Sequence, residues 1–205
     1  DANFDYSVTE LVDGAFFNSG QSCCGIERIY VHDSLYTQFV EAYIEKVNTL
    51  TLSNPIDPST TLGPVVKTSA ADWVRQQIKD AVTLGAKPCI DTTKFHHAAE
   101  GTPYIAPEVL IDVDHSMSVM TEESFGPVVG IMSVGSDEQA VHLMNDSDLG
   151  LTASLWTQDQ SAGEHLGNRL QTGTVFMNRC DYLDPALTWT GIKNTGRGAP
   201  VSVLG

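Results

Sequence analysis

Basic residues are scarce in this sequence, which has 11 Lys and Arg against 26 Asp and Glu and a formal net charge of −15. The acidic residues are spread along the chain, so their excess describes an acidic surface rather than a charged tail. We therefore expect neither nucleic acid nor an anionic membrane as a partner. No apolar run approaches the roughly 20 residues that span a bilayer. The longest candidate, Val128–Val134, has the length of a strand.

Cysteine is also scarce, and its spacing excludes two classes of site. The four cysteines stand at positions 23, 24, 89 and 180, without the Cys-x-x-Cys spacing of a zinc site and in a poor layout for a disulfide framework. The pair His96-His97 has no acidic residue or cysteine at ligand spacing, so we expect no metal. The first residues lack the basic and apolar succession of a secretory signal. A soluble, cytoplasmic protein with free thiols is the expectation.

Short apolar runs alternate with helical patterns along the chain. Helices are expected at Phe4–Ala15, from an N-cap at Ser34 to Val47, and at Ala70–Val82, Glu138–Asn145 and Ala162–Leu170. Strands are expected at Arg28–Val31, Pro88–Ile90, Tyr104–Ala106, Val128–Val134, Thr152–Trp156 and Thr174–Met177. This alternation predicts an α/β fold with a largely parallel sheet flanked by helices. No linker divides the chain, so we expect one domain over residues 1–205.

Two adjacent cysteines, Cys23 and Cys24, directly follow a glycine-bearing turn at Gly20. Backbone N–H groups in such a turn can point at a thiol and stabilise its thiolate, which is the nucleophilic form. Free cysteine is also among the most buried residue types, so a pair of core thiols is the alternative. Local chemistry nominates the pair and does not choose between its members.

The segment Phe16-x-x-x-Gly20-Gln21-x-Cys23, followed by Arg28, resembles the cysteine signature of the aldehyde dehydrogenase superfamily. In that signature the nucleophile is the cysteine two places after the glutamine. The resemblance therefore selects Cys23 as the catalytic residue and makes Cys24 a packing neighbour. It also places Ser22 and Cys24 at the substrate pocket.

The segment Glu122-Glu123-Ser124-Phe125-Gly126-Pro127 is similar to the Glu-x-Phe-Gly-Pro element of the same family. That resemblance implies NAD or NADP as the cofactor. Glu123 would bind the hydroxyls of the nicotinamide ribose, a task that suits a carboxylate with two acceptor oxygens, and Phe125 would pack beside the nicotinamide ring. Taken alone, the segment fits a solvated acidic turn that leads into a strand better than a cofactor site.

Three later segments follow the family in order: Asn145–Ser154, Gly173–Asn178 and Gly191–Gly198. Thr195 stands where the family usually has serine. The stretch Thr188-Trp189-Thr190 departs from the usual Pro-Phe-Gly, and Trp189 is expected to supply an aromatic wall of the substrate pocket.

The resemblance implies that residues 1–205 are the catalytic domain of a larger enzyme, a homo-oligomer when complete, with the dinucleotide-binding domain absent. The Glu-Leu-Gly-Gly-Lys motif that holds the general base would precede Asp1. We therefore expect the complete enzyme to oxidise a small-molecule aldehyde to a carboxylic acid with NAD or NADP, through a thiohemiacetal and a thioester, and this chain alone to be inactive.

Two alternatives stay open at this point. The chain could be a catalytically incomplete domain with a binding or structural role. It could also be a cysteine hydrolase, because Gln21-Ser22-Cys23 is similar to the entry to a papain-like cysteine. The α/β alternation and the ordered later motifs disfavour the hydrolase.

Overall fold

A computed structural model describes residues 1–203, which form two compact units. The Cys23 unit comprises Val12–Ser133, and the C-terminal unit comprises Asp1–Leu11 and the chain from Val134 onward. The first crossing between the units lies inside helix α1 (Phe4–Phe16) and the second at the end of strand β4 (Val128–Val134). Because the chain changes unit within regular elements, no Gly- or Pro-rich linker marks the boundary in the sequence.

The Cys23 unit contains a four-stranded sheet with the strand order β1-β4-β3-β2. Strands β3 (Glu108–Ile111) and β4 are parallel, with Glu108 opposite Val128. Strand β2 (Lys87–Pro88) runs antiparallel to β3, and β1 (Arg28–His32) lies at the other edge. The α/β class is confirmed, and the sheet is mixed rather than largely parallel.

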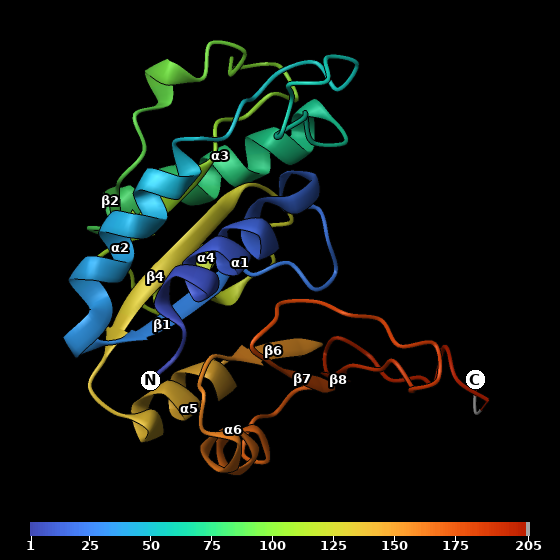
Figure 1. Ribbon diagram of the computed structural model, residues 1–205. Coiled ribbons are helices and arrows are strands. Elements are labelled where there is room, and N and C mark those ends of the chain that lie inside the picture. The colour runs from blue at the N-terminus through green and yellow to red at the C-terminus, as the bar shows by residue number, and fades with distance from the viewer. Residues whose placement is uncertain (204–205) are drawn as a thin grey trace. The chain divides into compact units, whose positions relative to one another are not determined.

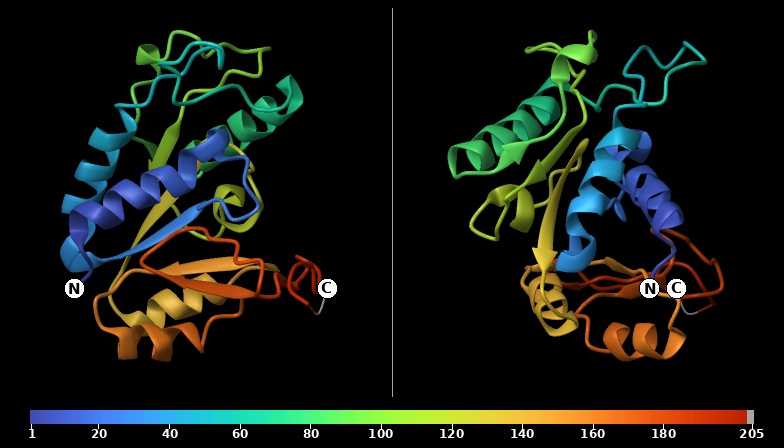
Figure 2. Two further views of the ribbon diagram at one scale, coloured as in Figure 1. Left: turned by 45° about the vertical axis from the view of Figure 1, so that its right-hand side comes forward. Right: turned by 60° about the vertical axis from the view of Figure 1, so that its left-hand side comes forward.

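Helices cover both faces of this sheet, with α2 (Asp33–Val47) on one side and α3 (Thr68–Thr83) on the other (Figure 2). The main apolar cluster joins α3, the short helix α4 (Ser118–Thr121) and the central strands β3 and β4. Its side chains from α3 recur at helical spacing, as in Ala71, Val74 and Ala81. This packing fixes both ends of the segment between α4 and β4, residues 122–127.

Two sequence expectations on local structure were wrong. The N-cap of α2 is His32 rather than Ser34, because the backbone N–H of Ser34 donates to His32 Nδ1 at 3.3 Å. Tyr104–Ala106 is not a strand, and the extended run begins only at Glu108. Ile105 and Ala106 are apolar because they are buried in the core, which an irregular segment can do as well as a strand.

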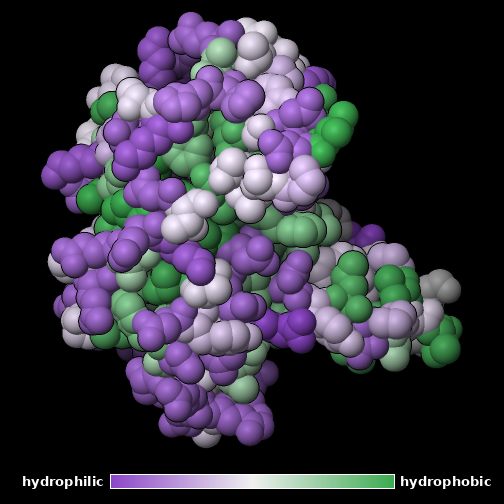
Figure 3. All heavy atoms as spheres, turned by 45° about the horizontal axis from the view of Figure 1, so that its top comes forward, coloured by the Kyte–Doolittle hydropathy of each residue, from purple (hydrophilic) through white to green (hydrophobic). Residues whose placement is uncertain are grey.

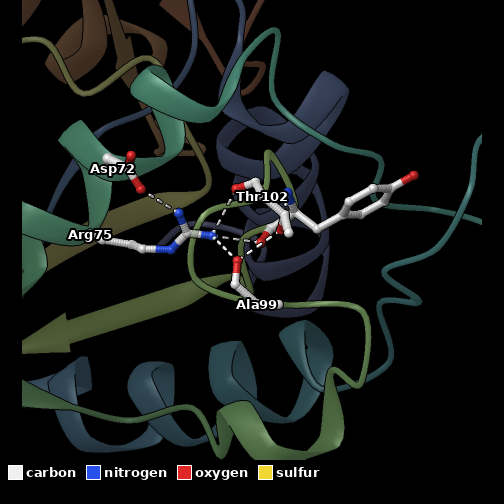
Figure 4. Close-up of polar contacts among 5 residues, drawn as sticks. Asp72, Arg75, Ala99 and Thr102 are labelled. Carbon is white, nitrogen blue, oxygen red and sulfur yellow. Dashed lines mark hydrogen bonds and ion pairs between the residues drawn. The ribbon is translucent and has the colours of Figure 1, made fainter.

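Arg75 on α3 holds the irregular segment that leads to β3 (Figure 4). Its Nη2 donates to the carbonyl oxygens of Ala99, Thr102 and Tyr104 at 2.8, 3.1 and 2.8 Å, and its Nη1 donates to Asp72 Oδ1 at 2.8 Å. The planar guanidinium, with its fixed set of donors, suits a cluster of carbonyl oxygens. The segment contains only a short 3₁₀ turn, η2 (Thr92–Lys94), so its carbonyl groups need such a donor.

The C-terminal unit is built on two strand pairs (Figure 1). Strands β6 (Thr152–Leu155) and β7 (Thr174–Met177) are parallel, while β5 (Leu149–Gly150) and β8 (Ile192–Lys193) are antiparallel. Helices α5 (Asp137–Asn145) and α6 (Gln160–Gly167) lie on the same side of the β6–β7 pair (Figures 1 and 2). Both helices start within two residues of the positions that the sequence predicts.

The surface visible in Figure 3 is largely hydrophilic, as the composition predicts. Larger apolar side chains are exposed along the last stretch of the described chain, at Tyr182, Leu183, Leu187, Val201 and Val203. No helix within residues 1–203 combines the length and apolar character needed to cross a membrane.

Candidate active site

The turn that precedes Cys23 has an unusual left-handed backbone. The 3₁₀ turn η1 (Phe17–Gly20) contains Asn18, Ser19 and Gly20 with φ of 50°, 58° and 75°. Residues other than glycine rarely adopt such backbone angles, so surrounding contacts must hold this turn in place. The buried hydroxyl of Ser19 donates to the carbonyl oxygen of Gly63 at 2.7 Å and supplies one such contact.

Gln21, the glutamine of the signature, supplies two more contacts. Its Nε2 donates to the carbonyl oxygen of Asn18 at 3.0 Å, and its Oε1 accepts from the backbone N–H of Val66 at 2.7 Å. One side chain therefore closes the left-handed turn and joins it to the loop before α3. The position of the cysteine loop is set by packing rather than by local sequence alone.

The two adjacent cysteines differ in exposure. Cys23 is exposed, whereas Cys24 is buried, with 8% of its surface accessible. Both lie in a turn closed by the Gly25 N–H, which donates to the Ser22 carbonyl oxygen at 3.0 Å, and the Ser22 hydroxyl lies 3.4 Å from Cys24 Sγ. Within residues 1–203, no acceptor pairs with the backbone N–H of Cys23. The thiol and the amide of Cys23 are thus both open to a ligand.

The other two cysteines have settings that make poor nucleophiles. Burial raises the pKa of the Cys89 thiol, and the nearby carboxylates of Glu108 and Asp112 raise it further. Cys180 is buried in the C-terminal unit, where its Sγ donates to the carbonyl oxygen of Glu10 at 3.2 Å. A thiol with a raised pKa carries less thiolate at neutral pH.

The segment after α4 presents Glu123 and Phe125 to solvent. Both residues are exposed, and 39% of the Phe125 surface is accessible. Phe125 has φ of 50°, an uncommon value for a bulky residue and one that costs about 1–3 kcal/mol. The segment is held from α3, where Trp73 Nε1 donates to the carbonyl oxygen of Glu123 at 3.3 Å. An exposed aromatic ring on a strained and anchored backbone is typical of a functional site.

Two contacts connect the cysteine loop directly to the Glu123–Phe125 segment: a close backbone approach at Gly20 and hydrogen bonds to Glu27. A Cβ atom built on Gly20 would overlap the carbonyl oxygen of Gly126, so glycine at position 20 permits a backbone approach that a side chain would block. The Glu27 carboxylate accepts from the backbone N–H of Ser124 at 3.0 Å and of Phe125 at 2.9 Å.

Arg28 adds a third connection, because its Nη1 donates to the carbonyl oxygen of Met120 at 3.3 Å. Met120 belongs to α4, which immediately precedes the Glu123–Phe125 segment. The arginine of the cysteine signature therefore supports the second motif rather than the thiol. The structure brings together two motifs that lie about 100 residues apart in the sequence.

Glu27 is partly exposed as a residue, but its carboxylate is enclosed by the loops that it joins. Burial raises its pKa above the ordinary glutamate value, and the hydrogen bonds from Phe125 and Ser124 oppose that shift. The nearby Glu123 carboxylate raises the pKa further. Glu27 lies inside the cysteine signature, yet the sequence offered no sign of its role because its partners are 97 and 98 residues away.

The remaining predicted residue, Trp189, belongs to the C-terminal unit. It is partly buried there, and its backbone N–H donates to the carbonyl oxygen of Pro200 at 3.0 Å. Its assignment to a substrate pocket stays a prediction. Among residues 1–203, no group of three or more His, Cys, Asp and Glu side chains could hold a metal ion.

The later motifs are held together within the C-terminal unit. Lys193 Nζ donates to the carbonyl oxygens of Asn145 and Ser147, both at 2.7 Å, and the Thr195 hydroxyl accepts from the Gly150 N–H at 2.8 Å. The hydroxyl is the group that serine and threonine share, so Thr195 can make this contact in place of serine. These motif residues have structural roles in this unit.

The comparisons with known proteins identify one family. Residues 1–203 match the profile of the aldehyde dehydrogenase family. The chain belongs to the aldehyde dehydrogenase family. It is 34% identical over 197 residues to succinate-semialdehyde dehydrogenase [NADP(+)] 1 of Mycobacterium ulcerans, covering 96% of this chain and 42% of the relative. It is 33% identical to a benzaldehyde dehydrogenase of Bacillus subtilis, covering 97% of this chain and 40% of the relative.

Solved structures confirm the family fold. Betaine aldehyde dehydrogenase of Staphylococcus aureus in complex with NAD+ superposes with a TM-score of 0.92 at 29% identity, over 100% of this chain and 41% of that one. The NADP complex of NADP-dependent glyceraldehyde-3-phosphate dehydrogenase of Bacillus halodurans gives 0.90 at 33% identity, over 98% and 41%. The aldehyde dehydrogenase chain described here thus spans about two fifths of the length of these relatives.

Proposed function

We propose that this chain carries the nucleophile and part of the cofactor site for NAD(P)-dependent oxidation of an aldehyde to a carboxylic acid. The observation that supports this most is the junction between the two loops. The exposed thiol of Cys23 lies on a loop that Gly20 and Glu27 fix to the segment presenting Glu123 and Phe125. A nucleophile held close to a hydride acceptor is the arrangement that this oxidation needs.

In the proposed reaction, the Cys23 thiolate bonds to the aldehyde carbon and the carbonyl oxygen becomes an oxyanion. The backbone N–H of Cys23, which has no acceptor within residues 1–203, is available to bind that oxyanion. Loss of such a donor can cost about a hundredfold or more in rate. Departure of hydride from the thiohemiacetal carbon leaves a thioester on Cys23. Water then adds to the thioester, the carbon–sulfur bond breaks, and the acid and the thiol are released.

NAD(P)+, when bound, accepts the hydride. Glu123 and Phe125 have the properties that its nicotinamide half requires. Within the described part of the chain, no hydrogen bond or ion pair engages the Glu123 carboxylate, whose two oxygens can accept from two ribose hydroxyls. The exposed Phe125 ring offers a flat apolar surface to the nicotinamide. Ser22 is proposed to line the aldehyde site, with Cys24 packed behind it.

The named relatives act on different aldehydes, so the proposal is confined to aldehydes as a class. The sequence contains no Glu-Leu-Gly-Gly-Lys motif and no Gly-x-Gly-x-x-Gly run. We therefore include in the proposal that these 205 residues alone bind NAD(P) weakly and do not turn over. The complete enzyme is proposed to be a cytoplasmic homo-oligomer.

The first test is chemical labelling of the folded chain with iodoacetamide, followed by peptide mapping. We expect Cys23 to react first, and Cys24 and Cys180 to react only when the protein unfolds, because both are buried. Cys24→Ser is the matched control, since it leaves the exposed thiol in place. Equal labelling of all four cysteines would contradict a special role for Cys23.

The second test is turnover of the whole protein with an aldehyde and NAD+ or NADP+, read by formation of NAD(P)H and by mass spectrometry of quenched samples. We expect an acyl group on the peptide that contains Cys23, and loss of turnover in Cys23→Ala but not in Cys89→Ala, which lies outside the proposed site. Thioester or peptide hydrolysis without a dinucleotide would favour a cysteine hydrolase instead.

A further inference from the structure

The Glu27 carboxylate accepts hydrogen bonds from two consecutive backbone N–H groups, those of Ser124 and Phe125. Its Oε1 accepts from Ser124 at 3.1 Å and from Phe125 at 2.9 Å, and its Oε2 accepts from Ser124 at 3.0 Å. The backbone of Glu27 also binds strand β4, because its carbonyl oxygen accepts from the N–H of Gly130 at 3.1 Å. Backbone and side chain of this residue therefore bind the same neighbouring segment.

A carboxylate is costly at this position. An enclosed carboxylate loses its hydration and, here, also faces the negative charge of Glu123. A glutamine would fill the same volume without that cost, but it has one acceptor oxygen, and its NH2 group would face a backbone donor. Only a carboxylate can accept at both of its oxygens from these two consecutive N–H groups.

Those two N–H groups belong to the strained residue of the site, Phe125, and to the residue before it. Phe125 has φ of 50° and an exposed ring, so neither its own preference nor burial keeps its backbone in place. Trp73 holds the segment from the other side through the Glu123 carbonyl oxygen. Glu27 is the anchor that comes from the loop of Cys23, and it therefore sets the segment relative to the thiol.

We propose that Glu27 is a positioning residue that fixes the Glu123–Phe125 segment relative to Cys23 and so aligns the nicotinamide with the thiohemiacetal carbon. This inference rests on the proposed function. Glu27 touches neither substrate nor cofactor in it, and acts through the backbone of Ser124 and Phe125. A misplacement of about 1 Å between reacting groups can lower a rate about a hundredfold.

The molecule offers a matched control in Glu108. This buried glutamate also accepts from three backbone N–H groups, those of Cys89, Ile90 and Val109, at 3.0–3.1 Å. Burial raises its pKa as it does for Glu27. Its partners lie beside the β2–β3 pair and include no residue of the proposed site. All three bonds are accepted at Oε1, which a glutamine keeps, so Glu108→Gln reports what removal of a buried negative charge does to stability without loss of the acceptor.

The experiment compares Glu27→Gln and Glu108→Gln in two measurements. The first is residue-resolved amide hydrogen exchange on the chain. We expect Glu27→Gln to speed exchange at Ser124 and Phe125 by tenfold or more beyond the change in global unfolding, and Glu108→Gln to leave those two amides unchanged. Unchanged exchange at Ser124 and Phe125 in a folded Glu27→Gln protein would overturn the proposal.

The second measurement is steady-state turnover by the whole protein with normal and deuterated aldehyde. Glu27→Gln should raise the KM for NAD(P), lower kcat by about ten- to a hundredfold, and enlarge the deuterium isotope effect because hydride transfer becomes slower. Labelling of Cys23 by iodoacetamide should stay within about twofold. A Glu27→Gln enzyme with the kinetics of Glu108→Gln would refute positioning.

The two proposals fail separately. Absence of turnover and of an acyl adduct in the unmodified protein would count against the proposed function, while the hydrogen exchange would still decide the role of Glu27. If Glu27→Gln does not fold, NMR of the unmodified chain replaces it. The amide signals of Ser124 and Phe125 should then titrate with the Glu27 carboxyl, and different midpoints would refute the contact.

Discussion

Replacement of Gly20 by alanine tests whether the two motifs truly meet. Gly20 has φ of +75°, and a Cβ atom added there would overlap the carbonyl oxygen of Gly126. The overlapping atoms are backbone, so they cannot move aside as the end of a flexible side chain would. The change therefore combines two costs, a left-handed alanine and a displaced loop.

The two costs can be separated because Gly101 has nearly the same backbone angle in open space. Its φ is +71°, and nothing lies within 4 Å of an added Cβ. A left-handed alanine costs about 1–2 kcal/mol, so we expect that loss from Gly101→Ala. Overpacking adds about 1–3 kcal/mol, so Gly20→Ala should lose about 2–5 kcal/mol of unfolding free energy in total.

Urea unfolding followed by the fluorescence of Trp73, in the same unit, measures both variants against one transition. With a slope near 2 kcal/mol per molar urea, the extra overlap should lower the midpoint of Gly20→Ala by about 0.5–1.5 M more than that of Gly101→Ala. Equal midpoints for the two variants would show that Gly20 and Gly126 are not in contact in solution, and would remove one of the links between the motifs.

Two further predictions concern stability. Arg75→Ala should cost about 1–3 kcal/mol of unfolding free energy, because three carbonyl oxygens lose their donor, and it should expose residues 92–104 to limited proteolysis. Arg75→Lys should recover only part of this loss, since an ammonium lacks the forked set of donors of a guanidinium. The raised pKa values of Glu27 and Glu108 mean that the folded chain binds their protons more tightly than the unfolded chain. Unfolding free energy should therefore fall as pH rises from about 4.3 through the folded pKa values, and Glu27→Gln should flatten that fall in urea titrations at several pH values. A slope unchanged by Glu27→Gln, or proteolysis unchanged by Arg75→Ala, would contradict the respective contact.

Much of the secondary structure follows from local pattern. Strand β4 and strand β7 have the expected bounds, and α1 ends at Phe16, one residue beyond the helix that the apolar spacing predicts. These elements have clear apolar spacing and strong stop signals. The errors fall where one pattern has two meanings, as at Tyr104–Ala106, whose apolar residues are buried without forming a strand.

The candidate site was predictable only as two separate motifs. The sequence by itself nominated Cys23, Glu123 and Phe125, because a motif is a local pattern of residue types. It left open how the motifs meet, since hydrogen bonds and steric contacts between distant segments leave no trace in local spacing.

Tertiary structure decided the contacts that join the motifs. It exposed Cys23 and buried Cys24, placed Gly20 against Gly126, and gave Glu27 partners near Phe125. The contacts of Gly20 and Glu27 depend on the path of a backbone about 100 residues away, which packing of α3, α4 and the central strands fixes. The proposed reactive groups thus came from the sequence, while the contacts that support them came from the fold.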